Sequence, residues 1–326
     1  MPYTYQDDFG RAINYLRVSV TDRCNLRCVY CMPTEGIDKQ AHGEILRYEE
    51  IALVVRAAAE LGVRKVRLTG GEPLLRRNIA ELAGRIAALP GIEDLSLSTN
   101  ATQLDRHAQA LKAAGVTRLN VSLDSLQQAR VEQINGRDVL ARVMAGLSAA
   151  QDAGFAPIKL NMVALRGTND DEIDEMVAFC MERGFVLRLI EAMPMGATGR
   201  NAEYLDLQPV KERLRTQFDL VETTMHGGGP ARYLGTADGR FNVGFITPIS
   251  QHFCQTCNRI RIAVDGTAYM CLGQDEKFEF RPLLRGGCSD AELESAILDA
   301  VNLKPERHDF NASPHKILRF MSMTGG

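Results

Sequence analysis

The sequence predicts an α/β protein whose parallel strands form an incomplete (β/α)6 barrel, and three observations support that prediction. Six short runs of β-favouring residues alternate with segments of helical periodicity. Several helical segments end in glycine, as in "ELGV", "AAGV", "DAGF" and "ERGF", where a residue at positive φ closes the last turn. Polar and apolar residues alternate along the strands, whereas parallel strands covered by helices on both faces are nearly continuous in apolar residues.

The expected elements follow one another in a regular strand-then-helix order. The strands are expected at residues 15–21, 65–69, 94–99, 118–123, 157–163 and 186–190. The helices between and after them are expected at residues 49–61, 79–89, 104–114, 139–153 and 172–181. This repetition predicts parallel strands joined by right-handed crossovers, in either an open doubly wound sheet or a barrel.

The polar residues of the strands favour the barrel. In the first run Arg17 and Ser19 share one face, opposite Leu16 and Val18. The same period of two places further polar residues on one face of the later strands: Lys65, Arg67 and Thr69; Ser96 and Ser98; Asn120, Ser122 and Asp124; Lys159 and Asn161. A curved sheet or incomplete barrel whose concave face lines a polar cavity explains this pattern, and the basic residues indicate an anionic ligand. A sheet with one solvated face is the alternative.

Composition limits the class of protein and the compartment. With 326 residues, 45% of them hydrophobic, the chain can bury a full core as one large domain with an appendage or as two smaller domains. The net charge is 38 minus 41, or -3, which gives no general attraction to nucleic acid. The sequence shows no signal peptide and no run of 18 apolar residues, so neither secretion nor membrane insertion is expected and the cytoplasm is the expected location. Eight cysteines in that compartment would stay reduced, which favours metal binding over disulfides.

A first cysteine triad lies in "TDRCNLRCVYCMP", at the spacing C-x3-C-x2-C. Cys24, Cys28 and Cys31 directly follow the first expected strand, which places them at the carboxyl end of the sheet, where α/β folds bind ligands. Zinc sites and iron-sulfur clusters usually take four protein ligands. Three cysteines would leave one iron of a cubane open to something other than protein. A zinc knuckle that borrows His42 or a distant cysteine is the alternative.

A second triad, Cys254, Cys257 and Cys271, lies in "FCQTCNRIRIAVDGTAYMC". A fourth ligand could come from His252 or Cys288, which would make this a structural zinc site. The strand that follows argues for more than structure, because Arg259 and Arg261 point the same way next to the metal, with Ile260 and Ile262 opposite. Structural zinc does not call for such a basic pair.

Two motifs together resemble the radical S-adenosylmethionine (SAM) superfamily. "CNLRCVYC" is similar to its cysteine signature, and "LTGGEPLL" after the second strand is similar to its GGEP motif. The resemblance implies a 4Fe-4S cluster on the first triad, whose open iron chelates SAM and whose electron releases a 5'-deoxyadenosyl radical. Gly70 and Gly71 have a physical role of their own, because residues without side chains let backbone approach a ligand closely. Glu72 would meet the methionine ammonium. Without the cysteines, "TGGEP" would be an ordinary strand-to-helix turn.

The presence of two triads narrows the resemblance to the molybdenum cofactor biosynthesis protein A family, the GTP 3',8-cyclases. The likeness runs through "YLRVSVTDRCN", "KVRLTGGEP", "LSTNAT", "LNVSLDSL", "FCQTCNRIR" and the terminal "GG", and so covers nearly the whole chain. It implies a TIM-type incomplete barrel over residues 1–195 and a C-terminal region, residues 196–326, that closes the barrel and carries a second 4Fe-4S cluster. The second cluster would offer its open iron to the guanine of GTP. The product would be (8S)-3',8-cyclo-7,8-dihydroguanosine 5'-triphosphate, formed after abstraction of the ribose 3' hydrogen.

The family's site residues carry over by position. The metal ligands would be Cys24, Cys28, Cys31, Cys254, Cys257 and Cys271. The SAM-binding residues would be Tyr30, Gly71, Glu72, Ser122 and Met193. The GTP-binding residues would be Arg17, Arg67, Ser98, Lys159, Arg259, Ile260 and Arg261, with Arg17, Arg259 and Arg261 also catalytic. Guanidinium groups in a partly dehydrated cavity suit a triphosphate, since they pair with phosphate oxygens through charge-assisted hydrogen bonds.

The resemblance also implies partners and leaves two rivals. The expected partners are GTP as substrate, a reduced flavodoxin- or ferredoxin-type electron donor, the downstream cyclic pyranopterin monophosphate synthase and a second copy of the chain. In the family the C-terminal Gly325–Gly326 pair reaches the active site, although a terminal Gly-Gly is usually a frayed end. One rival is another radical SAM enzyme with an auxiliary cluster, such as a peptide maturase, which would normally carry more C-terminal cysteines. The other is a zinc-stabilised nucleotide-binding module.

Overall fold

The computed structural model describes residues 5–225 and 227–325. All six expected strands are present, as β1 (Tyr15–Ser19), β2 (Lys65–Thr69), β3 (Asp94–Thr99), β4 (Arg118–Ser122), β5 (Ile158–Ala164) and β6 (Val186–Glu191). Each pairs in parallel with the next, so the α/β fold class with a parallel sheet is confirmed. The apolar faces of these strands, including Leu16, Leu68 and Leu97, are fully buried.

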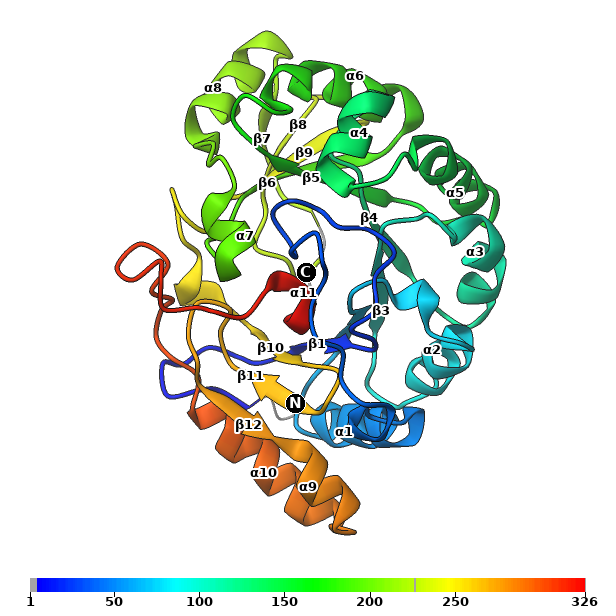
Figure 1. The fold of residues 1–326 in the computed structure, drawn as a ribbon, viewed down its shortest axis with the longest axis vertical. Coiled ribbons are helices and arrows are strands. Elements are labelled where there is room, and N and C mark those ends of the chain that lie inside the picture. Colours follow the sequence, from blue (N-terminus) through cyan, green and yellow to red (C-terminus); the bar gives the residue numbers. More distant parts are fainter. Residues whose placement is uncertain (1–4, 226, 326) are drawn as a thin grey trace.

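Helices cover the outer face of the sheet. The expected helices are confirmed as α1 (Tyr48–Glu60), α2 (Ile79–Ala87), α3 (Leu104–Ala113), α5 (Leu140–Asp152) and α6 (Ile173–Arg183). Figure 1 shows them around the outside of a strongly curved sheet, with the C-terminal helix α11 (Met321–Thr324) near the middle of the ring. The four glycines expected to end helices, Gly62, Gly115, Gly154 and Gly184, all have positive φ, between 68° and 106°. Among the described residues, no helix has both the length and the apolar character needed to cross a bilayer.

One helix of the barrel was not expected from the sequence. Helix α4 (Gln128–Asn135) buries Val131 and Ile134, and the other residues of its short sequence, "QARVEQIN", supply little apolar periodicity. Its position matters for function, because the carbonyl groups of Ile134 and Asn135 accept hydrogen bonds from Val29 N and Arg27 N at 3.0 and 2.9 Å. Helix α4 therefore holds the loop of the first cysteine triad.

The C-terminal region extends the sheet at both edges. It contains α7 (Gly196–Asn201), α8 (Leu207–Gln217), β7 (Val221–Thr223), β8 (Arg232–Gly235), β9 (Asn242–Ile246), β10 (Arg259–Ile262), β11 (Thr267–Tyr269), β12 (Lys277–Glu279), α9 (Phe280–Arg285) and α10 (Asp290–Asn302). Strand β9 pairs in parallel with β6, and β10 pairs in parallel with β1. The resulting order has twelve strands with β12 and β7 at its ends. Strand β10 thus brings the second triad beside the first strand of the barrel.

Candidate active site

A single cavity on the concave side of the sheet is lined by both cysteine triads. All six expected cysteines, Cys24, Cys28, Cys31, Cys254, Cys257 and Cys271, contribute to its wall. Polar side chains from β1, β2, β3, β4 and β6 line the space between them. Triads that lie more than 200 residues apart in the sequence therefore face a common ligand space.

The first triad lies in the loop after β1, with Cys31 N donating to the Cys28 carbonyl at 2.9 Å. The surrounding protein raises the pKa of all three thiols, chiefly through burial, and raises that of Cys31 to about 12. Thiols in such surroundings become thiolates only when a metal supplies positive charge. Three cysteine sulfurs with a ligand cavity beside them are the donor set that suits a 4Fe-4S cluster with an open position.

The glycine turn after β2 packs against this loop. A Cβ added to Gly71 would lie 2.4 Å from the Arg23 carbonyl oxygen, and one added to Gly70, where φ is 152°, would lie 2.5 Å from that of Thr21. Gly71 N donates to Thr21 O at 2.7 Å, and Glu72 N donates to Arg23 O at 2.8 Å. Because Gly70 and Gly71 have no side chains, their backbone packs directly against the backbone of the cysteine loop and also lines the cavity.

The Glu72 carboxyl group lies at the inner end of that turn and is 1% exposed. It accepts hydrogen bonds from Thr99 Oγ1 and Asn100 N, both at 2.7 Å, and from Leu74 N at 3.1 Å. Burial nevertheless raises the pKa of Glu72 to about 7. A carboxyl group that is this deeply buried favours a cationic ligand group beside it, since such a group would stabilise its ionised form.

Tyr30 is held at the cavity wall by a buried carboxyl group. Its hydroxyl donates to Asp124 Oδ2 at 2.7 Å, and Val163 N donates to Asp124 Oδ1 at 2.9 Å. Burial raises the pKa of Asp124 to about 6. The five residues expected from the family resemblance to bind SAM, Tyr30, Gly71, Glu72, Ser122 and Met193, all line the same cavity as the first triad.

A row of arginines crosses the sheet between the triads. In the parallel register Arg17 on β1 lies opposite both Arg67 on β2 and Arg261 on β10. Arg259 on β10 lies opposite Tyr15, two residues along the strand from the level of Arg17 and Arg261. Burial lowers the pKa of Arg17 well below its usual value, and the neighbouring charges of Arg261 and Arg67 lower it further. Positive groups gathered in a dehydrated cavity are suited to a polyanion.

Several cavity-lining polar atoms have no hydrogen-bond partner within the described ranges. They are Ser98 Oγ, Asn161 Oδ1 and the Nε atoms of Arg188, Arg259 and Arg261. Buried polar groups are rarely left unsatisfied, so these atoms indicate contacts with a polar ligand. The sequence pattern does not single out Arg188, because "VLRLIE" predicts an apolar strand; the arginine between Leu187 and Leu189 is the signal that could have identified it.

Two expected substrate residues lie outside the cavity wall. Lys159 is 3% exposed, and its Nζ donates to the Tyr233 hydroxyl at 3.5 Å, beyond the described lining. Burial lowers the pKa of Lys159 to about 7. The side chain of Ile260 packs in the hydrophobic core on the opposite face of β10 from Arg259 and Arg261, and Ile260 is not part of the described cavity lining.

The second triad surrounds the start of β10 and the end of β11. Cys257 N donates to the Cys254 carbonyl at 3.1 Å in the short turn Cys254–Thr256. Burial raises the pKa of Cys254 and Cys271. It also acts on Cys257, but the positive charges of Lys304 and Arg259 lower the pKa of that thiol to about 6. The second triad therefore lies in more positive surroundings than the first.

The residues considered as a fourth ligand do not reach the cavity. His42, His252 and Cys288 are absent from its described lining, whereas His308 and Phe310 are part of it. His308 and Phe310 also fill the space beside Gly273, where an added Cβ would lie 2.7 Å from His308 Cβ. Within residues 5–225 and 227–325, no three His, Cys, Asp or Glu side chains are grouped as ligands of a single metal ion.

The C-terminal tail also reaches the cavity. Met321 lines it, and Ser322 lies beside the Cys31 thiol. Gly325 contacts Thr69, since a Cβ added there would lie 2.4 Å from Thr69 Cγ2. Gly326, the last residue of the expected Gly-Gly tail, lies outside the described residues.

Two family models match the chain in succession. Residues 18–180 match the radical SAM superfamily, and residues 185–310 match Molybdenum Cofactor Synthesis C. The chain is 48% identical to the GTP 3',8-cyclase of Pseudomonas putida strain W619, over 98% of this chain and 97% of that protein. It is 45% identical to the GTP 3',8-cyclase of Pelotomaculum thermopropionicum, over 98% of this chain and all of that protein.

Among solved structures, the fold is similar to that of Streptococcus suis SuiB bound to its precursor peptide SuiA. The TM-score is 0.66 at 17% identity, over 96% of this chain and 76% of SuiB. The SAM-bound form of SuiB gives a TM-score of 0.64 at 16% identity, over 91% of this chain and 73% of SuiB. At this identity the likeness concerns the fold alone.

Proposed function

The chain belongs to the GTP 3',8-cyclase family of the radical SAM superfamily, and from this premise we propose how its two triads and the arginine row divide the reaction. The family's enzyme converts GTP to (8S)-3',8-cyclo-7,8-dihydroguanosine 5'-triphosphate in molybdenum cofactor biosynthesis. The observation that carries the proposal is that both triads line one cavity, with the arginine row between them.

Cys24, Cys28 and Cys31 would hold the 4Fe-4S cluster that family membership implies, with SAM beside it. When the cluster is bound and reduced and SAM is present, the pair supplies a 5'-deoxyadenosyl radical that removes the ribose 3' hydrogen of GTP. The chain's own part is to place SAM: Glu72 would accept from its ammonium group, Gly71 would leave room for its methionine portion, and Tyr30 would contact its adenosyl portion. Ser122 and Met193 would complete this wall.

Arg17, Arg67 and Ser98 would bind the polyanionic substrate, and Arg17, Arg259 and Arg261 would orient it for reaction. Charge-assisted hydrogen bonds from several guanidinium groups fix a triphosphate more firmly than single point charges do. A primary carbon radical attacks many C–H bonds, so selectivity depends on holding the 3' position close and excluding water. Arg188 lines the same wall. Lys159 lies outside that wall, beside Tyr233, and would act on the substrate from there, whereas Ile260 would contact the substrate through its backbone.

Cys254, Cys257 and Cys271 would hold a second 4Fe-4S cluster, which would leave one iron available to the guanine base. The three sulfurs fit such a cluster because they line one wall of the cavity. The Nε atoms of Arg259 and Arg261, which have no hydrogen-bond partner among the described residues, line the same wall. We place the boundary between barrel and C-terminal region at residues 195 and 196, after the last barrel strand β6, although the second family match already begins at residue 185.

The proposal includes the partners that this chemistry needs. A reduced flavodoxin- or ferredoxin-type protein would supply electrons, and cyclic pyranopterin monophosphate synthase would take the product. The working form would be a homodimer in the cytoplasm.

The test is anaerobic reconstitution followed by incubation with SAM, GTP and a strong reductant. Two cubanes predict about eight irons per chain, and turnover should yield 5'-deoxyadenosine together with the cyclised nucleotide. Formation of 5'-deoxyadenosine that does not depend on GTP would contradict the assignment of GTP as substrate. A colourless protein with zinc in place of iron would contradict the cluster assignment.

A further inference from the structure

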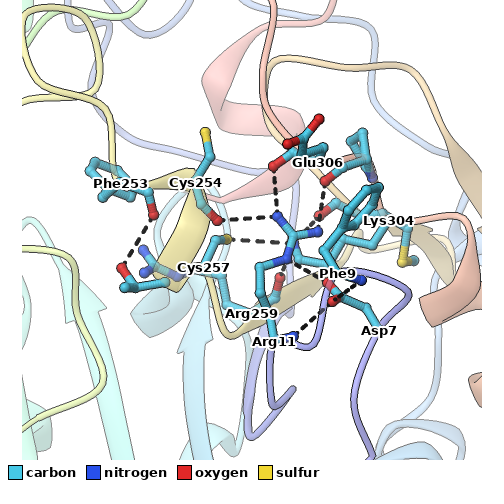
Figure 2. A network of polar contacts seen from close by, with 12 residues as sticks. Asp7, Phe9, Arg11, Phe253, Cys254, Cys257, Arg259, Lys304 and Glu306 are labelled. Carbon is cyan, nitrogen blue, oxygen red and sulfur yellow. Dashed lines mark hydrogen bonds and ion pairs between the residues drawn. The ribbon is translucent and has the colours of Figure 1, made fainter.

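Lys304 is a buried lysine beside the second triad that neither the sequence motifs nor the proposed substrate contacts account for. It lies in the segment after α10 and is 3% exposed. Figure 2 shows it on the same side of the Cys254–Thr256 turn as Arg11, close to Cys257. Lysine is almost never fully buried in proteins unless its charge is compensated, so its position calls for a role.

The Lys304 ammonium group meets three acceptors. Its Nζ lies 2.7 Å from the Met270 carbonyl, 2.9 Å from the Arg259 carbonyl and 3.4 Å from Cys257 Sγ. An ammonium group has three donor hydrogens and no acceptor, so these contacts match its full donor capacity. The environment is therefore that of a charged lysine, with one donor directed at a cysteine sulfur.

The three acceptors of Lys304 belong to the two separate segments that carry the cysteines of the second triad. Cys257 and Arg259 belong to the turn and strand that carry the first two cysteines, whereas Met270 immediately precedes Cys271. A single side chain thus links the segments on which all three sulfurs depend.

Arg11 fixes the segment that carries Lys304. Its Nη1 donates to the carbonyls of Cys254 at 3.1 Å and Glu306 at 2.8 Å, and its Nη2 donates to Pro305 O at 2.7 Å. Asp7 pairs with Arg11 Nε at 2.6 Å, and both side chains are buried (Figure 2). The main chain beside Lys304 is therefore tied to the main chain of a cysteine ligand, which keeps the ammonium group near the triad.

We propose that Lys304 is a positioning residue of the second cluster that raises its reduction potential by directing a buried positive charge at the Cys257 sulfur. The inference rests on the proposed assignment of a 4Fe-4S cluster to Cys254, Cys257 and Cys271. Reduction adds negative charge to a cluster, so a nearby cation stabilises the reduced form more than the oxidised form. Hydrogen bonds to the cluster sulfurs act in the same direction, and both are recognised determinants of cluster potential.

The first triad provides an internal comparison. Among the described residues, Cys28 contacts two neutral side chains, that of Asn135, whose Oδ1 lies 3.3 Å from Cys28 Sγ, and that of Tyr30. A change at Lys304 should therefore alter the potential of the second cluster and leave that of the first unchanged.

The experiment is an anaerobic redox titration followed by electron paramagnetic resonance, on full-length reconstituted protein. The C24A/C28A/C31A variant isolates the signal of the second cluster, and its iron content is measured before any lysine is changed. Absence of a second cluster at that stage would refute the proposed cluster itself, separately from the role of Lys304. The variants are K304M, K304Q and K304R, and K277M is the control because Lys277 is an exposed lysine on β12.

We expect K304M and K304Q to lower the ratio of reduced to oxidised second cluster at a fixed potential about tenfold, a midpoint shift of about 59 mV for a one-electron couple. K304R should recover most of the shift because it keeps the charge, and K277M should leave the midpoint unchanged. In the chain with all six cysteines, the first cluster should titrate as in the wild type.

An unchanged midpoint in K304M at full iron content would overturn the proposal, and so would an equal shift of both clusters. Loss of the second cluster in K304M and K304Q but not in K304R would support it, because the charge would then be needed to hold the cluster. Loss in all three variants would overturn it, since packing rather than charge would be the requirement.

Discussion

Arg17 on β1 is the register partner of Arg261 on β10, so guanidinium groups from the two ends of the chain share one level of the sheet. Arg67 occupies the same level on β2. Like charges held this close in a buried place destabilise the ligand-free protein. The repulsion between these arginines would be offset when a polyanion binds, which explains why the row is present.

Replacing Arg17 by alanine should affect ligand binding and stability in opposite directions. Loss of one charge-assisted contact should weaken GTP binding by about 10- to 100-fold, corresponding to about 1.5–3 kcal/mol. The ligand-free variant should be at least as stable as the wild type, because one of three neighbouring like charges is gone. Equilibrium binding of GTP and urea unfolding measure the two effects.

The matched control for R17A is R213A, which removes an exposed arginine of α8 paired with Asp174 at the surface. This variant should bind GTP as the wild type does. Equal loss of GTP affinity in both variants would count against a specific role for the arginine row.

The cysteines should separate by variant into ligands and bystanders. C31A should lose the first cluster and all SAM cleavage, while C257A should keep SAM binding and lose about half of the iron, since each cubane carries about four irons. C288A should retain both clusters, because Cys288 packs against the core away from the cavity. Iron analysis with absorption spectra measures this, and a loss of iron in C288A would favour a second site with four cysteine ligands.

Gly71→Ala should damage the first site by sterics alone. The added Cβ would lie 2.4 Å from Arg23 O, so the cysteine loop must move, at a cost of about 1–3 kcal/mol in the free energy of unfolding. SAM binding should weaken with it. Chemical denaturation and SAM binding measure both effects.

Gly84→Ala is the comparison for G71A, because Gly84 lies in α2 and an added Cβ meets no atom within 4 Å. Alanine in place of glycine inside a helix should stabilise the protein by about 0.5–1 kcal/mol. If G71A were as stable as the wild type and bound SAM normally, the tight packing of the glycine turn on the cysteine loop would be unimportant.

Glu72 should make the stability of the ligand-free protein depend on pH. Its pKa rises from 4.5 to about 7 in the folded protein, chiefly through burial. The folded state therefore binds the proton more tightly than the unfolded state, and Glu72 contributes stability that is complete below pH 4.5 and is lost as pH rises through about 7.

Thermal unfolding between pH 4.5 and pH 8 tests this for E72Q, whose side chain does not titrate. The melting temperature of the wild type should fall relative to that of E72Q as pH rises through this range. E132Q, at an exposed position of α4, should follow the wild type. Parallel curves for the wild type and E72Q would contradict the raised pKa.

Much of the fold was predictable because local patterns report it directly. Strands β2 and β3 begin and end at the expected residues, since polar and apolar side chains alternate along them up to Ser98 of β3. Helix α4 was missed because it is short and because, apart from Val131 and Ile134, its sequence supplies little apolar periodicity. The same alternation identified Arg17, Arg67 and Ser98, which the cavity brings together.

The remaining site residues depend on contacts that no local pattern encodes. Arg11 and Lys304 lie in segments without periodicity, and their roles arise only where the two ends of the chain meet at the second triad. Lys159 has the expected period and shares its register level with Asn120 and Ser98, but its ammonium group turns toward Tyr233 and lies outside the described cavity lining. Sequence alternation assigns a residue to a face of the sheet, whereas the group that a long side chain contacts depends on the tertiary structure.

In the proposed reaction, SAM on the first triad and GTP on the second meet across one cavity. The most direct measurement uses GTP deuterated at the ribose 3' position, incubated anaerobically with SAM, reductant and the reconstituted enzyme, with mass analysis of the 5'-deoxyadenosine formed. We expect 5'-deoxyadenosine to gain one deuterium from GTP in each productive turnover. Cyclised nucleotide accompanied by unlabelled 5'-deoxyadenosine would contradict it.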